Sequence, residues 1–231
     1  MTTSTTRTIS TTRAPQRPER PRLLLRAGAF AGPLFVLASI AQMPFRDGFD
    51  VTKHPFSFLL IGSPGWIQSM VFVAVGGLFA AAGAGLLSIV GGRLGTVAFG
   101  SAVGVGAGKI VAGLAAPQPS FGFPPGTPDG PPAVLTTASV VHAVAFGVAV
   151  LCWISLLVML GVVLRRRAET GTAWLVFIVA ALLPAIPATS GASFATVLLY
   201  AVAISAYLVT SVALLRIARR GRGRRAGTRV A

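Results

Sequence analysis

Long apolar runs repeat along this chain and constrain its fold more than any other feature. Most are near 20 residues, the length of helix that crosses roughly 30 Å of hydrocarbon. Only 11% of the 231 residues are charged, against about 25% in soluble domains. The sequence therefore predicts an all-α fold, a polytopic transmembrane helical bundle. The expected six spans are residues 23–43, 66–90, 94–116, 137–164, 173–188 and 194–217.

The fifth of these spans is the least well supported by the sequence. It is short and its end contains Pro184 and Pro187. Because proline removes a helical hydrogen bond, this span is either kinked or part of a shallow hairpin with the sixth.

The distribution of the net charge of +15 predicts how the chain sits in its membrane. Seventeen of the 20 lysines and arginines fall on one side of the six-span layout, in the two tails, at Arg93 and at 165–167. The positive-inside rule then places both termini in the cytoplasm. The expected parts are a disordered basic cytoplasmic tail at 1–22, a six-helix transmembrane domain at 23–217 and a basic cytoplasmic tail at 218–231.

This distribution also bears on partners and source. Basic residues beside apolar spans attract anionic lipid headgroups, so membrane lipids rather than nucleic acid are the expected partner. The predominance of arginine over lysine suggests a bacterium with a GC-rich genome, and hence a multi-pass protein of the cytoplasmic (cell) membrane.

The segment 46–66, RDGFDVTKHPFSFLLIGSPGW, is a charged stretch between two long apolar runs. It holds Asp47, Asp50, Lys53 and His54, and the orientation above places it outside the cell. We expect it to take part in any ligand recognition. The alternative for Asp47 and Asp50 is a turn-forming role beside a glycine, through Asx-type hydrogen bonds.

Lys109 and His142 are ionisable residues inside expected spans. With a rise of 1.5 Å per residue, both lie roughly 8–11 Å below the outer boundary, on antiparallel helices adjacent in sequence. They could therefore face one cavity. The alternatives are that Lys109 snorkels outward and that His142 makes a neutral hydrogen bond between helices.

Signals for metal or covalent chemistry are weak. The possible metal ligands, His54, His142, Asp50 and Asp129, are scattered rather than spaced for one ion, so we predict no metal site. Ser57 lies near His54, but a proline separates them, which is a poor basis for nucleophilic catalysis. No phosphate loop or dinucleotide fingerprint occurs, and no cofactor is expected.

Two further segments bear on packing. Gly100, Gly104 and Gly108 form a ladder of small residues on one helix face, which either packs on a neighbouring span or forms a homo-oligomer contact. The segment 117–132 has seven prolines and cannot be a helix or strand. With the apolar segment 55–61, which we expect along the surface, it would cap the outer ends of the spans.

Several segments together resemble the bacterial membrane family called domain of unknown function 998. They are GAFAGPLFVLA at 28–38, GFDVTKHPFSFLLIGSPGWIQ at 48–68, GFPPGTP at 122–128, and His142. The resemblance covers most of the chain from Leu23 to the sixth span. It implies a six-span protein with no established activity. The positions that it carries over are Asp50, His54, Pro55, Ser57, Gly62, Trp66, Gln68 and His142.

This chain departs from the family pattern at two places. Gln118 stands where members commonly have an acidic residue, and Lys109 stands where they usually have an apolar one. The resemblance therefore implies that the family's polar site is altered here, with charge moved into the third span.

We expect an integral membrane protein that binds a lipid or amphipathic ligand under the outer cap, or that serves as an assembly partner. The alternatives are a membrane-embedded enzyme acting on a lipid-like substrate, with His142 and Asp50 as acid and base, and a small transporter. Enzymatic activity is the less favoured reading. The candidate ligand-binding residues are Asp50, His54, Ser57, Trp66, Gln68, Lys109 and His142.

Overall fold

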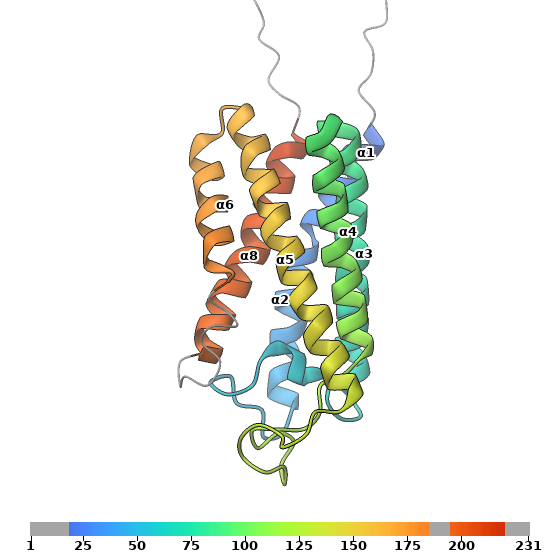
Figure 1. Ribbon diagram of the computed structural model, residues 1–231, viewed down its shortest axis with the longest axis vertical. Coiled ribbons are helices and arrows are strands. Elements are labelled where there is room, and N and C mark those ends of the chain that lie inside the picture. The colour runs from blue at the N-terminus through green and yellow to red at the C-terminus, as the bar shows by residue number, and fades with distance from the viewer. Residues whose placement is uncertain (1–18, 185–194, 220–231) are drawn as a thin grey trace, which may run out of the picture.

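The computed structural model describes residues 19–184 and 195–219, which form a helical bundle (Figure 1). Its helices are α1 (Glu19–Ala29), α2 (Ala31–Gln42), α3 (Gly65–Val90), α4 (Gly92–Leu114), α5 (Thr137–Arg166), α6 (Thr170–Leu182) and α8 (Ala195–Ala218). Two short 3-10 helices, η1 (Met43–Phe45) and η2 (Phe56–Leu60), lie between α2 and α3. The predicted helical membrane bundle is confirmed.

Five helices in the described residues are long and apolar enough to cross a membrane, when α1, α2 and η1 are taken together. The fifth expected span corresponds to α6, which has 13 residues and is shorter than the others. Residues 185–188 of that expected span lie outside the described residues, as does the first residue of the sixth.

The first span is not one continuous helix. It begins at Glu19, four residues before the expected start, and is interrupted at Phe30 between α1 and α2. Pro33 lacks the N–H that would bond the carbonyl of Ala29, and its ring crowds the same carbonyl. The series of helical hydrogen bonds is therefore broken at this point.

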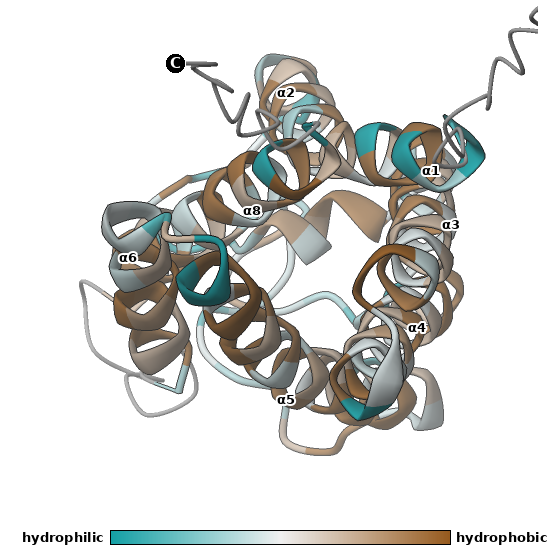
Figure 2. Cartoon of the chain, turned by 90° about the horizontal axis from the view of Figure 1, so that it is seen from above, coloured by the Kyte–Doolittle hydropathy of each residue, from teal (hydrophilic) through white to brown (hydrophobic). Residues whose placement is uncertain are grey.

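Seen end-on, the helices form a ring in the order α1, α3, α4, α5, α6, α8 and α2 (Figure 2). The α3–α4 connection is the tightest, because Gly91 and Gly92 have φ of 66° and 57°, a conformation that favours glycine. Thr136 begins α5 as an N-cap, accepting a hydrogen bond from the Ser139 amide.

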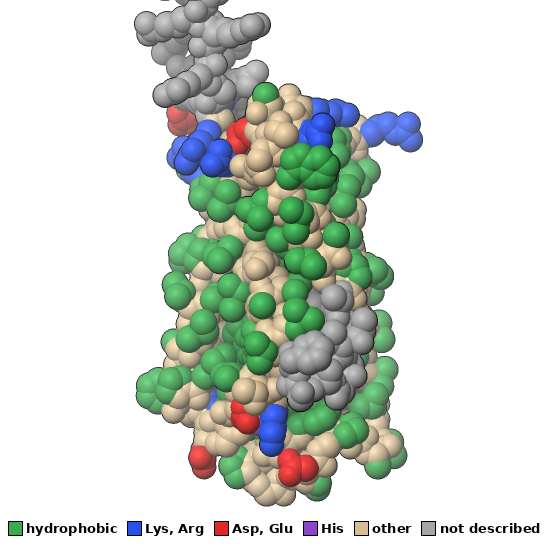
Figure 3. All heavy atoms as spheres, turned by 90° about the vertical axis from the view of Figure 1, so that its left-hand side faces the viewer, with side chains coloured by type: hydrophobic (Ala, Val, Ile, Leu, Met, Phe, Trp, Pro, Cys, Tyr) green, Lys and Arg blue, Asp and Glu red, His purple; other side chains and the backbone are tan. Residues whose placement is uncertain are grey.

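The surface and the two ends of the bundle differ sharply in polarity. Apolar side chains cover the middle of the bundle, while charged ones gather at its two ends (Figure 3). Leu37, Met70 and Leu151 are among those exposed by more than 60%. An apolar surface of this kind suits hydrocarbon, not water. We call the end that holds 43–64 and 115–136 the capped end, and the other, which holds the α3–α4 and α5–α6 turns, the basic end.

The cap is folded more deeply than the sequence suggests. Residues 55–61 were expected along the surface, but Phe58, Leu59 and Ile61 are buried. Phe58 and Ile61 pack with Phe123 of the proline-rich segment in an apolar cluster separate from the main core. The cap therefore has a small core of its own.

Candidate ligand cavity

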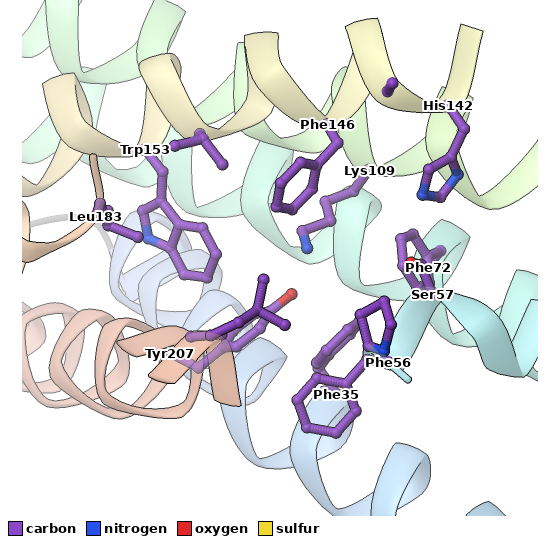
Figure 4. A pocket seen from close by; sticks show the side chains of 15 residues that line it. Phe35, Phe56, Ser57, Phe72, Lys109, His142, Phe146, Trp153, Leu183 and Tyr207 are labelled. Atoms are coloured by element: carbon purple, nitrogen blue, oxygen red, sulfur yellow. The ribbon is translucent and has the colours of Figure 1, made fainter. Parts of the chain in front are cut away.

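A cavity of about 260 Å³ lies inside the helix ring near the capped end. Five helices, η2 and the residue after α6 contribute to its wall, most of which is apolar (Figure 4). The lining residues are Phe35, Pro55, Phe56, Ser57, Phe72, Lys109, His142, Ala143, Phe146, Val150, Trp153, Leu183, Leu199, Ala203 and Tyr207.

Lys109 extends from α4 into this cavity, five residues before the helix ends at Leu114. Its side chain is only 5% exposed. The Nζ atom lies over four aromatic rings, 4.8 Å from the centroid of Phe35, 5.2 Å from Phe72, 5.3 Å from Tyr207 and 5.6 Å from Trp153. The ammonium group is thus held in an aromatic cage.

The cage attracts the buried charge but leaves its hydrogen-bond donors without acceptors. A lysine at the centre of a membrane helix costs about 3 kcal/mol on insertion scales. Each cation–π contact contributes about 0.5–1 kcal/mol at exposed sites and about 2 kcal/mol or more when water is excluded, so four faces are enough to offset this cost. Aromatic faces do not replace the strong acceptors that an ammonium N–H finds in water. Within the described residues, no hydrogen bond or ion pair reaches the Nζ atom.

Tyr207 on α8 and Ser57 on η2 add hydroxyl groups to the same wall. The Tyr207 hydroxyl is buried and has no hydrogen-bond partner in the described part of the chain. The Ser57 hydroxyl is half-buried and shows no hydrogen bond to His142 there. The cavity therefore contains polar groups that the described protein leaves unsatisfied.

His142 lies on the wall at about the same depth as Lys109, five residues into α5. Its Nδ1 is 2.8 Å from the carbonyl oxygen of Ala112 and 2.9 Å from that of Ala115. Because both partners only accept, Nδ1 carries the proton and donates to them. In the neutral ring, Nε2 is then left with a free lone pair.

We infer that the cavity opens between the halves of α5 and α8 nearest the cap. Its lining residue Ala143 is exposed, and Phe146, Leu199 and Ala203 are partly exposed. These residues belong to the apolar middle of the bundle rather than to either charged end. The opening therefore faces the zone where lipid chains would lie.

His54 lies outside this cavity and holds the cap together. Its Nδ1 accepts from the Asp50 amide at 2.9 Å, and its Nε2 donates to the Phe121 carbonyl at 2.9 Å. The ring stacks on Phe58 with 5.5 Å between centroids. Both ring nitrogens of His54 are therefore engaged within the cap.

Asp50 forms the turn that the sequence offered as an alternative. Its carboxylate accepts from the Thr52 hydroxyl at 2.6 Å and from the Thr52 amide at 2.8 Å. Hydrogen bonds from the hydroxyl, then from the amide, hold the pKa of Asp50 below its ordinary value. The Asp50 amide thus bonds to His54, but the side chains of Asp50, His54 and His142 do not converge on one pocket.

Gln68 and Trp66, the other candidates, also lie away from the cavity wall. Gln68 is fully buried and joins α3 to α2, donating to the Ser39 hydroxyl at 2.9 Å and accepting from Gln42 at 2.7 Å. Trp66 is 67% exposed at the capped end of α3, a position typical of an interfacial tryptophan. Of the seven candidates, the structure brings Ser57, Lys109 and His142 together.

Sequence reasoning missed the aromatic cage around Lys109. Its members come from four different helices, and only the packing of those helices identifies them. Trp153 and Tyr207 carried a signal, since aromatic residues with a polar group seek a partner when buried. Trp153 has one, the Thr210 hydroxyl at 2.9 Å, whereas the Tyr207 hydroxyl has none in the described residues.

Of three comparisons with known proteins, one gave a match, and that match is to a protein family. The family model described as "Protein of unknown function (DUF998)" matches residues 29–216. No curated protein matches the chain significantly. No solved structure does so either.

Proposed function

We propose that this chain, which belongs to the DUF998 family of proteins of unknown function, is a membrane protein that binds an amphipathic, lipid-like molecule in the cavity beneath the cap. One observation carries the proposal: a mostly apolar cavity contains a buried lysine without an acceptor in the described residues. An apolar wall with a few convergent polar groups is the usual form of a ligand site.

The opening supports access from the membrane. A molecule with an alkyl chain would slide between α5 and α8 with its chain still in hydrocarbon. The cap would cover it from the aqueous side, because Pro55 and the first residues of η2, Phe56 and Ser57, belong to the wall. The cap is also tied to α8, where the Tyr200 hydroxyl donates to the His54 carbonyl at 2.8 Å.

The same proposal includes orientation. We place the capped end outside the cell and the basic end in the cytoplasm of a bacterial cell, because arginines of α1, α5 and α8 gather at the basic end. Binding is favoured over catalysis, since a nucleophile must be paired with a base. In the described residues, no hydrogen bond joins Ser57 to His142.

A cavity-filling substitution tests the proposal. Ala203→Trp adds an indole to the cavity wall on α8, while Ala201→Trp, two residues away, places the same group on an exposed position outside the wall. Lipids that co-purify with each protein in mild detergent are quantified by mass spectrometry. We expect Ala203→Trp to lose a lipid that wild type and Ala201→Trp retain. Equal lipid content in all three folded proteins would refute the proposal.

A further inference from the structure

Lys109 is a buried cation for which this chain supplies no anion. The chain has five acidic residues, all within the described ranges. Glu19 and Glu169 lie at the basic end, and Glu169 pairs with Arg216 at 3.1 Å. Asp47, Asp50 and Asp129 lie in the loops of the capped end. The five helices that line the cavity therefore place no carboxylate beside the ammonium group.

The donors in the cavity outnumber its acceptors. Lys109 has three N–H groups and Tyr207 one O–H, and neither residue has an acceptor among the described residues. The four aromatic rings attract the positive charge but offer it no oxygen. The free Nε2 of His142 is an acceptor, yet it carries no negative charge in the neutral ring. A ligand that satisfies this site must supply an anionic oxygen.

The size of the cavity limits what enters it. A volume of about 260 Å³ is slightly below the range of roughly 300–1,000 Å³ for sites that enclose a drug-sized molecule. It accommodates a small polar group and the first carbons of one chain. The rest of the chain must leave through the opening beside Ala143 and Ala203 into the bilayer.

We infer that the cavity binds the anionic headgroup of a single-chain amphiphile, a fatty carboxylate or an alkyl phosphate, with Lys109 as its counterion and the Tyr207 hydroxyl as a second donor. This inference rests on the binding function proposed above and adds the chemical class of the ligand. The alkyl chain lies against Phe146 and Leu199 and extends between α5 and α8.

Three probes of equal chain length separate the contribution of the headgroup charge to binding from that of the alkyl chain. Palmitate, hexadecyl phosphate and hexadecanol are titrated against the delipidated full-length protein in an uncharged detergent, and bound probe is measured with radiolabelled material. The proteins are wild type, Lys109→Arg, which keeps the charge, and Lys109→Met, which keeps the apolar stem.

We expect at least one anionic probe to bind wild type, and to bind Lys109→Met about 10- to 100-fold more weakly, the range for loss of a charged hydrogen bond. Lys109→Arg should bind it more tightly than Lys109→Met does, and hexadecanol should bind all three proteins weakly. Binding of palmitate alone would identify a free fatty acid, and binding of hexadecyl phosphate alone a phosphate ligand.

Two outcomes would overturn the inference in distinguishable ways. If hexadecanol binds wild type as tightly as the anions, the ligand need not be anionic, although binding of an amphiphile would stand. If no probe binds and Ala203→Trp retains its co-purified lipids, both proposals fail. The comparison of probes on wild type decides the first point even if Lys109→Met does not fold.

Discussion

His142 shows how one side chain fixes the geometry of the cavity. Its Nδ1 donates from α5 to the carbonyls of Ala112 and Ala115 near the end of α4. Carbonyls in the last turn of a helix have no donor within that helix. His142 therefore supplies them, and since Ala112 follows Lys109 by less than one turn, it also fixes the height of the ammonium group.

We predict that His142→Ala lowers the free energy of unfolding by about 1–3 kcal/mol, because two buried carbonyls lose their donor. His142→Gln keeps an N–H donor on a flexible chain and should lose less. Thermal unfolding of the delipidated proteins in one detergent measures both. Equal stability of His142→Ala and wild type would show that these hydrogen bonds contribute nothing net.

The depth of the two ionisable residues was predictable, but their surroundings were not. Helical rise is constant, so counting from the span ends placed Lys109 and His142 at one level. Phe35, Phe72 and Tyr207 could not be recognised as neighbours of Lys109. In a membrane helix both the buried and the lipid-facing sides are apolar, and the sequence does not mark which side faces inward.

Glycine residues allow the closest contacts between helix backbones. A Cβ atom on Gly76 of α3 would lie 2.6 Å from the Gly106 carbonyl of α4, so the two backbones touch there. Gly108 similarly meets the backbone of α5, since a Cβ on it would lie 2.7 Å from the Ala145 carbonyl. Gly104 of α4 packs on the side chain of Cys152 of α5. These contacts stack α3, α4 and α5 in sequence.

The small-residue ladder thus packs within the bundle at Gly104 and Gly108. This is one of the two alternatives that the sequence left open. Gly100 has no atom within 4 Å of its would-be Cβ, so it forms no such contact. Self-association through this face stays a prediction. Sequence spacing identified the face correctly but could not identify its partner.

Two adjacent glycines of α3 give a matched test of this packing. Gly76→Ala should destabilise the bundle by about 1–3 kcal/mol, the usual cost of overpacking, because the added methyl meets the α4 backbone. Gly77→Ala should not, since its Cβ would have nothing within 4 Å. Unfolding temperatures in detergent compare the two. A similar loss from both would point to helix flexibility rather than to the α3–α4 contact.

The whole molecule has two chemically different ends. Arginines of α1, α5 and α8 lie at the basic end, while the capped end carries a few residues of both signs. The helical membrane bundle and the pattern of charge could be read from the sequence, because bilayer thickness and lipid charge impose both. The small core of the cap could not, because it joins segments more than 60 residues apart.

Thiol labelling in intact cells tests the proposed orientation. Val134→Cys lies in the cap and is 79% exposed in wild type, and Gly171→Cys lies at the basic end with open space around it. Both are made in a Cys152→Ala background, which removes the single native cysteine. A membrane-impermeant maleimide should label Val134→Cys in intact cells and Gly171→Cys only after lysis. The reverse pattern would invert the orientation.

The opening inferred between α5 and α8 would change how the strength of the proposed binding is described. On the proposed route through the bilayer, a ligand would not be dissolved in water on its way to Lys109. Occupancy then depends on the mole fraction of that amphiphile in the surrounding leaflet, and not on its aqueous concentration. Half of the protein molecules would then carry ligand at one particular mole fraction of the amphiphile in the membrane.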